Sequence, residues 1–301
     1  MSKALADDRA VLITGSTGFV GFHLAKRLLA DGRSVHLIVR KTSRRTRLAT
    51  LPGAPIVHEH DGGTEQMLTI FRDVSPGTVF HLASAVVSEH KPEDIERLVR
   101  SNLLFGVQLL EGSVRAGVAR FINTGTFWQH YGGHDYDPAS LYAATKKGFE
   151  DLMRYYLNAC GLTGLTLELP DTYGPEDDRH KLFPQLRAAS LSAAAPLPLS
   201  PGEQRIAPVH VEDVVNAYLH AERLLVRDPE LSGKSFAVTS KEVFTLQEIV
   251  KIYETELGRR VPIEWGGRPY RHREMMEPHH SQLLPGWSPA ISLREGLRTI
   301  L

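Results

Sequence analysis

The sequence has little cysteine, no net charge and no long apolar run, and each shortage excludes a class of protein. Cys160 is the only cysteine among the 301 residues, which excludes a disulfide framework and fits a reducing compartment. Lys and Arg number 35, as do Asp and Glu, so no whole-chain field attracts nucleic acid or an anionic membrane. The first ten residues, MSKALADDRA, lack the apolar core of a signal peptide, and no run could span a bilayer. We therefore expect a cytoplasmic protein with no nucleic-acid or membrane partner.

Short apolar runs alternate with helical stretches through the first half of the chain. Several of these runs are almost entirely apolar, as strands buried on both faces are. The alternation predicts a doubly wound parallel sheet, an α/β Rossmann fold. The expected strands are residues 10–14, 34–40, 55–61, 78–83, 120–126 and 165–169, and the clearest helices are residues 19–30, 92–116 and 141–160.

The alternation breaks up after Pro170. Residues 191–204 include three prolines and are expected to form a loop. We therefore predict a first domain of residues 1–170 and a smaller α/β lobe of residues 171–301, some segments of which return to the first domain. The lobe's expected elements are helices at 211–226, 246–257 and 292–300 and strands at 235–239 and 261–265.

A glycine-rich stretch, TGSTGFVG, joins the first predicted strand to the first predicted helix. Gly15 permits a tight turn, Gly18 lets the backbone approach a pyrophosphate, and Gly21 lets the helix pack close to the sheet. The helix N-terminus offers free N–H groups to the phosphates. The stretch therefore predicts a dinucleotide site contacted by Gly15, Thr17, Gly18, Phe19, Val20 and Gly21.

The segment after the second predicted strand, VRKTSRRTR, is basic and contains no carboxylate. An acidic residue there would bond the ribose 2′-hydroxyl of NAD, whereas arginine and lysine attract a 2′-phosphate. The segment therefore favours NADPH as cofactor, with Arg40, Lys41 and Arg44 as contacts. Asp61, which closes the third predicted strand, is the expected partner of the adenine amino group.

Tyr142 and Lys146 lie four positions apart and so share one face of the predicted helix 141–160. Thr126 closes the fifth predicted strand, at the carboxyl edge where open α/β sheets bind ligands. The three side chains can therefore converge beside a nicotinamide held by the glycine loop.

Together these motifs resemble the extended short-chain dehydrogenase/reductases, the NAD-dependent epimerase/dehydratase family. The matching pieces are TGSTGFVG, HLASA, the asparagine of SNLLFGVQLLE, the threonine of NTGTF, and YAATK. The resemblance implies a homodimer with a four-helix interface made by residues 92–116 and 141–160. It also implies a catalytic tetrad of Asn102, Thr126, Tyr142 and Lys146 and cofactor contacts that include Gly62, Leu82, Ala83, Ser84, Tyr142, Lys146 and Asp171.

The resemblance gives each member of the tetrad a role. A free phenol has a pKa of about 10, and a nearby ammonium lowers it. Tyr142 is then expected to give its proton to a carbonyl oxygen while Lys146 lowers the pKa of Tyr142 and holds the nicotinamide ribose. Thr126 is expected to donate a hydrogen bond to the same carbonyl oxygen, and Asn102 to hold a water or a helix.

The chain after residue 170 resembles the sugar-nucleotide branch of the same family. In DTYGP, Asp171 stands where that branch has asparagine, and GEQRIAPVHVEDV matches its arginine-containing segment. Arg205 and Arg268 are implied contacts of a substrate diphosphate, with Arg271 and Arg273 as weaker candidates. The implied substrate contacts are Ser84, Thr126, Phe127, Trp128, Asp171, Arg205 and Arg268.

FINTGTFWQHYG, LYAATK, DTYGP and WGGRPYR together resemble nucleotide-sugar 4-ketoreductases of the CDP-abequose synthase type. That resemblance implies NADPH-dependent reduction of a CDP-linked 4-keto-3,6-dideoxyhexose. The prediction for this chain is reduction of a CDP- or dTDP-linked 4-keto-6-deoxyhexose in deoxysugar biosynthesis, with UDP and GDP left open as the nucleotide. A nucleotide-sugar 4-epimerase with tightly bound NAD and a non-catalytic dinucleotide sensor stay open as alternatives. A 4,6-dehydratase is disfavoured because Phe127 and Trp128, rather than an Asp-Glu pair, follow Thr126. No histidines have convincing metal-ligand spacing, so no metal site is predicted.

Overall fold

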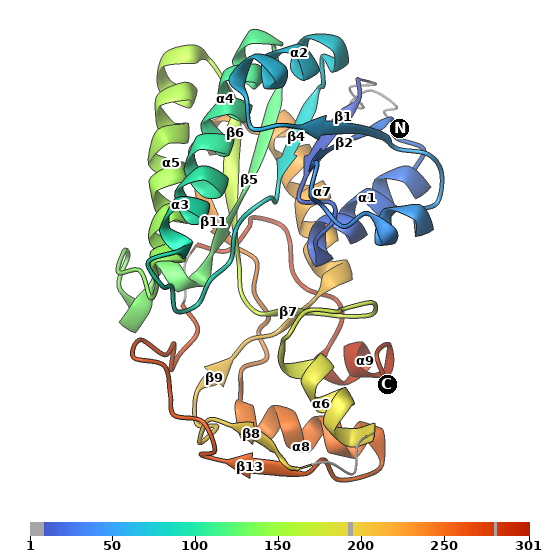
Figure 1. Cartoon of the computed structure of the whole chain (residues 1–301), viewed down its shortest axis with the longest axis vertical. Coiled ribbons are helices and arrows are strands. Elements are labelled where there is room, and N and C mark those ends of the chain that lie inside the picture. Colours follow the sequence, from blue (N-terminus) through green and yellow to red (C-terminus); the bar gives the residue numbers. More distant parts are fainter. Residues whose placement is uncertain (1–8, 192–194, 280–281) are drawn as a thin grey trace. The chain divides into compact units, whose positions relative to one another are not determined.

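The computed structural model describes residues 9–191, 195–279 and 282–301, which fall into two compact units (Figure 1). The first unit is the described part of Met1–Thr126 together with Ser140–Glu168 and Val215–Phe236. The N-terminal residues 1–8 and residues 192–194 of the expected loop lie outside the described residues. The assignments of residues 1–170 to a cofactor-binding domain and of residues 171–301 mainly to a sugar-binding lobe stay predictions. The second unit consists of Phe127–Ala139, Leu169–Val214 and Ala237–Leu301.

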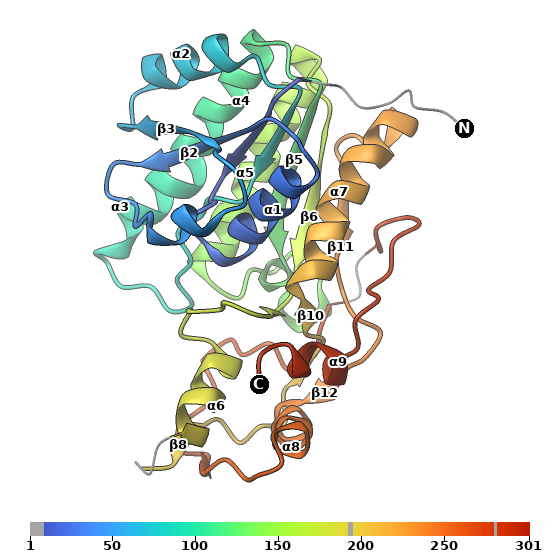
Figure 2. The same cartoon turned by 90° about the vertical axis from the view of Figure 1, so that its right-hand side faces the viewer.

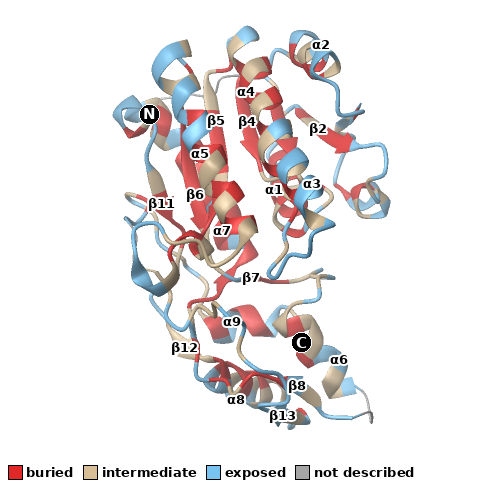
Figure 3. Cartoon of the chain, turned by 60° about the vertical axis from the view of Figure 1, so that its left-hand side comes forward, coloured by how far each residue is buried: buried red, intermediate tan, exposed pale blue. Residues whose placement is uncertain are grey.

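The first unit is built on a seven-stranded parallel sheet of order β11-β6-β5-β4-β1-β2-β3. The predicted doubly wound α/β fold is therefore confirmed. Figure 3 shows that buried residues follow these strands, as the apolar runs of the sequence indicate. The strands are β1 (Val11–Thr14), β2 (Val35–Arg40), β3 (Ile56–His60), β4 (Thr78–His81), β5 (Arg120–Thr126), β6 (Gly164–Leu169) and β11 (Ser235–Ala237).

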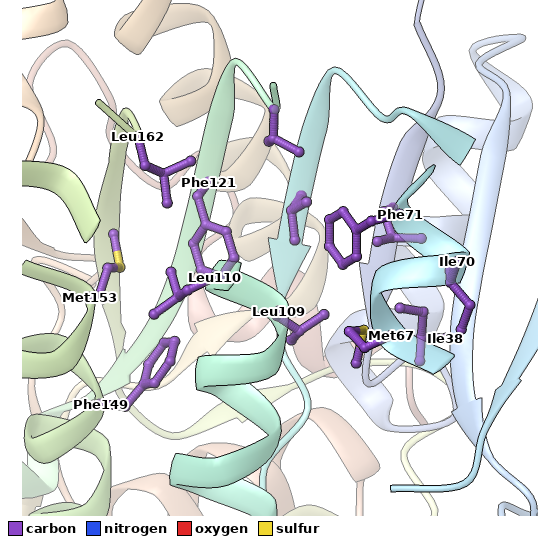
Figure 4. Close-up of a cluster of buried hydrophobic side chains, with 13 residues drawn as sticks. Ile38, Met67, Ile70, Phe71, Leu109, Leu110, Phe121, Phe149, Met153 and Leu162 are labelled. Carbon is purple, nitrogen blue, oxygen red and sulfur yellow. The ribbon is translucent and has the colours of Figure 1, made fainter. Parts of the chain in front are cut away.

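Helices cover both faces of the sheet (Figures 1 and 2). One face packs against α2, α4 and α5 through a fully buried apolar cluster that includes Phe71, Leu109, Phe121 and Phe149 (Figure 4). The other face carries α1 and α7, joined by a hydrogen bond from Arg27 to Asn216. These helices are α1 (Phe19–Ala30), α2 (Thr64–Val74), α3 (Asp94–Val99), α4 (Phe105–Arg115), α5 (Leu141–Cys160) and α7 (Val211–Arg227), which enters from the second unit.

One predicted helix is interrupted. The stretch expected as a single helix, residues 92–116, contains a π-helical turn at Arg100–Leu104 between α3 and α4. A π turn adds a residue to one helical turn and re-aims the side chains around it. Here the turn carries Asn102, whose contacts are described below.

The second unit consists of short elements around its own core. Two of its helices begin with complete capping boxes, at Thr245 with Glu248 and at Ser292 with Glu295, which satisfies backbone N–H groups that short helices leave free. Its core gathers Tyr173, Phe183, Leu186, Tyr253, Leu297 and neighbouring aliphatic residues. The elements are α6 (Leu182–Leu191), α8 (Leu246–Leu257), α9 (Leu293–Arg298), β7 (Thr172–Tyr173), β8 (Leu197–Leu199), β9 (Arg205–Ile206), β10 (Val209–His210), β12 (Phe244–Thr245) and β13 (Ile263–Trp265).

The loop prediction for residues 191–204 is wrong in part. Strand β8 lies within that stretch and pairs in parallel with β13 as a two-stranded sheet. Pro198 is tolerated because each strand of a two-stranded sheet has one unpaired edge, where a missing N–H costs no ladder bond. The prolines that indicated a loop therefore mark an edge strand.

Candidate active site

The glycine loop has the geometry that its sequence predicts. Gly15 has a φ of +79°, which side chains rarely adopt, and a Cβ there would lie 2.6 Å from the Ala83 nitrogen. A Cβ on Gly21 would overlap the Gly15 carbonyl. The Gly18 N–H donates to the Gly15 oxygen over 2.9 Å. Gly15 therefore provides the turn and Gly21 the close helix packing.

The start of α1 has features that fit a dinucleotide phosphate. Its N-cap residue is Gly18, which has no side chain to cap the helix, and its first turn contains no acidic residue, so the positive end of the helix favours an anion. The neighbouring Ser16 hydroxyl is buried without a hydrogen-bond partner within the described residues. An unpaired buried hydroxyl is costly, and a bound phosphate oxygen would satisfy it. Thr17, Phe19 and Val20 follow in the same turn.

The cations in the basic segment after β2 differ in whether another side chain of the protein contacts them. Arg45 pairs with Glu59 over 2.7 Å, and Arg47 lies 5.4 Å from the Phe22 ring centre. The remaining cations are exposed, and their side chains have no ion-pair partner within the described part of the chain. These are the three residues predicted to meet a 2′-phosphate, Arg40, Lys41 and Arg44.

Asp61 lies just beyond the end of β3, at the N-terminal side of α2. Its carboxylate accepts a hydrogen bond from the Gly63 N–H over 2.7 Å, and its own N–H donates to the Gln66 side chain. Gly62 has a φ of +100° and its carbonyl accepts from Gln108 over 2.9 Å. Asp61 is exposed, so its second carboxylate oxygen is available to a ligand.

Thr126 and Tyr142 meet at the carboxyl end of β5, and Lys146 follows Tyr142 by one helical turn. Ser140 caps α5 by accepting from the Ala143 N–H over 3.3 Å, which places Tyr142 and Lys146 in the first two turns of the helix. The Thr126 hydroxyl is hydrogen-bonded to the Tyr142 phenol, and both Tyr142 and Lys146 are buried. The structure therefore brings Thr126 and Tyr142 into contact and places Lys146 one helical turn further along α5.

Burial decides the protonation of both groups. It raises the pKa of Tyr142 to about 12, although the hydrogen bond from Thr126 opposes the shift. It lowers the pKa of Lys146 to about 8, although the Glu150 carboxylate opposes the shift. The pKa of Tyr142 is thus raised, whereas a lowered value is expected from the sequence, because burial disfavours the phenolate. Tyr142 is a protonated donor at neutral pH.

Asn102 uses the whole hydrogen-bonding capacity of its side chain. Its amide oxygen accepts from the Ala85 N–H over 2.7 Å and from the Ser84 hydroxyl over 3.1 Å. Its amide nitrogen donates to the Ala85 carbonyl over 3.0 Å and to the Thr145 hydroxyl over 2.9 Å. Asn102 therefore ties the loop after β4, which contains Leu82, Ala83 and Ser84, to the helix of Tyr142 and Lys146.

The predicted substrate contacts other than Ser84 and Thr126 belong to the second unit. Phe127 is buried, and Trp128 is half-buried with the Lys181 ammonium 5.8 Å from its ring centre. Asp171 is exposed and pairs with Lys181 over 3.5 Å. In the same unit Arg205 pairs with Glu277 over 3.6 Å, and Arg268 is exposed with its N–H donating to Leu199.

Sequence reasoning missed several residues around the tetrad. Glu150 is buried beside Lys146 and is hydrogen-bonded to Ser235 over 3.2 Å. The His81 ring is bonded to the Thr14 hydroxyl over 2.8 Å, and burial holds its pKa well below the usual range. The spacing of Glu150, four positions after Lys146, could have indicated an ion pair. No local signal marks Ser16 or Thr145.

The described residues show neither a metal-binding cluster nor a membrane-spanning helix. The described residues contain no group of three or more His, Cys, Asp or Glu side chains arranged to hold a metal ion. None of the helices within residues 9–191, 195–279 and 282–301 combines the length and the apolar character that crossing a bilayer requires.

Comparison with known proteins identifies the class that this fold and this site define. The NAD dependent epimerase/dehydratase family matches residues 11–230, and the chain belongs to that family. The resemblance seen in the sequence is thereby confirmed.

The chain is similar to particular members of that family over nearly its whole length. It is 24% identical to a CDP-abequose synthase of Salmonella muenchen over 298 residues, which cover 98% of this chain and 97% of that protein. It is 25% identical to a UDP-glucose 4-epimerase of Mycolicibacterium smegmatis, with 95% of each chain covered.

Solved structures show the same fold. A Thermus thermophilus UDP-glucose 4-epimerase in complex with NAD superimposes with a TM-score of 0.79 and 25% identity, covering 96% of this chain and 97% of that one. A Thermotoga maritima UDP-glucose 4-epimerase with UDP-glucose gives a TM-score of 0.80 and 23% identity, with 96% of each chain covered.

Proposed function

We propose that this protein is an NADPH-dependent reductase of the 4-keto group of a nucleotide-linked 4-keto-6-deoxyhexose, with CDP or dTDP as the nucleotide. The observation that carries the proposal is the buried hydrogen bond between Thr126 and the Tyr142 phenol, with Lys146 one helical turn further along α5. Net reduction of a ketone needs a proton donor in its loaded form. The full-length similarity to CDP-abequose synthases supports the sugar-nucleotide class.

Each residue of the cluster has a defined task in this reaction. NADPH, when bound, supplies the hydride that reaches the ketone carbon. Tyr142 donates its proton to the ketone oxygen, and the Thr126 hydroxyl donates a hydrogen bond to the same oxygen. The charged form of Lys146, present below pH of about 8, favours the phenolate that remains and holds the ribose hydroxyls. Asn102 keeps the loop after β4 and α5 in place.

The choice of NADPH over NADH rests on the exposed cations after β2. Among the residues that the structure describes, no carboxylate pairs with Arg40, Lys41 or Arg44, whereas Glu59 pairs with Arg45. A 2′-phosphate carries negative charge and several acceptor oxygens, so it would form ion pairs with these cations that a neutral 2′-hydroxyl cannot form. The Arg44→Ala variant is therefore expected to raise the KM for NADPH with little change for NADH. Arg45→Ala is the matched control.

A second function has its own support. UDP-glucose 4-epimerases are among the relatives, and a solved structure with NAD is 25% identical. An epimerase uses the same side chains but holds its NAD tightly, because the cofactor takes a hydride and returns it. The two functions therefore predict different behaviour of the cofactor.

One assay separates the two functions. Purified protein would be mixed with NADPH, or separately NADH, and a panel of nucleotide-linked 4-keto-6-deoxysugars, with loss of reduced-cofactor absorbance as the readout. Rapid consumption of NADPH by a CDP- or dTDP-linked ketosugar supports the reductase. Protein that purifies with bound NAD and interconverts nucleotide sugars without consuming cofactor contradicts it and supports the epimerase.

The proposal includes a homodimer formed through α3, α4 and α5. Several apolar side chains on these helices and the π turn are exposed, and Tyr155 is 62% exposed. Light scattering coupled to size exclusion would test this, since a Tyr155→Glu variant should become monomeric. The exposed apolar residues are Ile95, Val99, Leu104, Leu152 and Tyr155.

A further inference from the structure

The segment between Thr126 and Ser140 is a closed loop. Within it, the Ala139 N–H donates to the Trp128 oxygen over 2.8 Å, and the Tyr131 N–H donates to the Asp137 oxygen over 2.7 Å. The segment, Phe127–Ala139, belongs to the second unit. Its two ends are covalently continuous with Thr126 and with the cap of the helix that bears Tyr142.

A second stretch of the chain, residues 271–279, contacts side chains of this loop. The Arg273 guanidinium lies 4.0 Å from the Tyr131 ring centre and forms an ion pair with Asp137. Nearby, the His130 and His279 rings stack with centres 3.8 Å apart and planes 8° apart. Three aromatic or charged side chains of the loop are thus held by two residues from a segment distant in the sequence.

Arg271 has a related arrangement. Its guanidinium lies 5.1 Å from the Trp128 ring centre, and one of its nitrogens is 3.9 Å from the Glu274 carboxylate. A planar guanidinium can stack on a ring and pair with a carboxylate at the same time, which an ammonium does poorly. The sequence suggests that Arg271 and Arg273 contact substrate phosphate, whereas the structure places both guanidinium groups over rings of the loop and pairs Arg273 with Asp137. The Arg273 Nε atom is buried without a hydrogen-bond partner within the described residues.

We propose that Arg273 is a positioning residue for the reaction, supported by Arg271, and that it acts through the loop Phe127–Ala139. By fixing Tyr131 and Asp137, it fixes the path of the loop between Thr126 and Ser140. That path sets how closely the Thr126 hydroxyl and the Tyr142 phenol can be presented to one ketone oxygen. The inference rests on the proposed function.

This role predicts a kinetic pattern that differs from phosphate binding. A positioning residue acts on the transition state, so its removal lowers kcat and leaves the KM values largely unchanged. A phosphate contact binds ground state and transition state alike, so its removal raises the KM for the nucleotide sugar and leaves kcat unchanged.

The experiment measures ketosugar reduction and loop mobility in the same set of full-length variants. The set contains Arg273→Ala, Arg273→Lys and Asp137→Asn, with Tyr131→Phe as the variant that retains the ring. Arg298→Ala is the matched control, because Arg298 pairs with Glu256 elsewhere in the second unit. Loop mobility is read as acrylamide quenching of Trp128 fluorescence, in a background where the other two tryptophans, Trp265 and Trp287, are replaced by phenylalanine.

We expect kcat to fall roughly tenfold in Arg273→Ala. The KM for NADPH and the KM for the nucleotide sugar should each stay within about twofold of the wild-type value. Trp128 should become more accessible to acrylamide in the same variant. Asp137→Asn and Arg273→Lys should show smaller changes in the same direction. Tyr131→Phe and Arg298→Ala should behave as wild type, and Arg273→Lys keeps the test usable if the alanine variant fails to fold.

Two results would overturn the inference while leaving the proposed function intact. One is an active enzyme whose Arg273→Ala variant has a raised KM for the sugar nucleotide and an unchanged kcat. The other is unchanged kcat together with unchanged quenching. If the wild-type protein reduces no ketosugar, the proposed function is wrong and the positioning role is wrong with it. Increased quenching in Arg273→Ala would in that case show that Arg273 makes a structural contact only.

Discussion

The two units hold their functional side chains in opposite ways. In the first unit, Tyr142 and Lys146 are 9% and 2% exposed, and desolvation moves the pKa of both. In the second unit, the predicted substrate contact Arg205 has a side chain that is 49% exposed and pairs with the exposed Glu277 carboxylate over 3.6 Å. Exposed ion pairs contribute little to stability and rearrange easily. Burial thus fixes the groups assigned to proton transfer, whereas those assigned to recognition remain adaptable.

The comparison predicts that changes at the buried groups act on kcat. Tyr142→Phe removes the proposed proton donor and keeps the packing of the ring. We expect kcat to fall by about 10²–10⁴-fold, while NADPH binding followed by fluorescence stays within a few-fold of wild type. A variant that retains more than a tenth of the wild-type kcat would show that another group supplies the proton.

Gly15 should be a position where the first unit tolerates an added methyl group poorly. Gly15→Ala places a side chain at positive φ, which costs about 1–3 kcal/mol, and also presses it against the backbone at Ala83. Gly32 is a matched control, because its φ is +77° but its added Cβ would meet nothing within 4 Å. Thermal unfolding should therefore show a larger loss for Gly15→Ala than for Gly32→Ala. Equal losses would mean that the close approach to Ala83 relaxes easily.

A change in the second unit should act on substrate binding. Arg205→Ala removes a cation proposed to meet the substrate diphosphate, and a hydrogen bond to a charged group contributes about 1.5–3 kcal/mol. We expect the KM for the nucleotide sugar to rise by roughly tenfold or more, with kcat nearly unchanged. A roughly tenfold loss in kcat with an unchanged KM in steady-state kinetics would contradict the assignment of substrate recognition to the second unit.

The smallest expected effect is a shift in pH dependence. Glu150 raises the pKa of Lys146 against the effect of burial, so Glu150→Gln should lower that pKa below about 8. The ammonium is lost as pH rises through its pKa, and the alkaline limb of the kcat profile should therefore move to lower pH. Glu111→Gln is a control, since Glu111 pairs with the exposed Arg115. An unmoved limb would mean that Lys146 does not titrate in the active range.

Much of the first unit could be predicted because its signals are local. The bounds of α1 and α5 match the expected ranges, since apolar periodicity, glycines and a serine cap act within a few residues. The glycine loop was predicted for the same reason. The raised pKa of Tyr142 could not be predicted, because it depends on burial by segments distant in the sequence.

The second unit was less predictable, and the reason is physical. Strand β8 exists through its pairing with β13, more than sixty residues later in the chain, and the prolines beside it favoured a loop. The association of Tyr131 and Asp137 with Arg273 is likewise a contact between distant segments. Neither of these contacts leaves a periodic pattern in the sequence.

The strand order has a consequence for how the protein is made. Strand β11 begins at Ser235 and forms one edge of the sheet beside β6, and the chain passes through second-unit segments between them. A ribosome must therefore release most of the chain before the sheet that carries Thr126 is complete. Until then the outer edge of β6 is an open template for other strands, so expression at lower temperature or with a chaperone should raise the yield of folded enzyme.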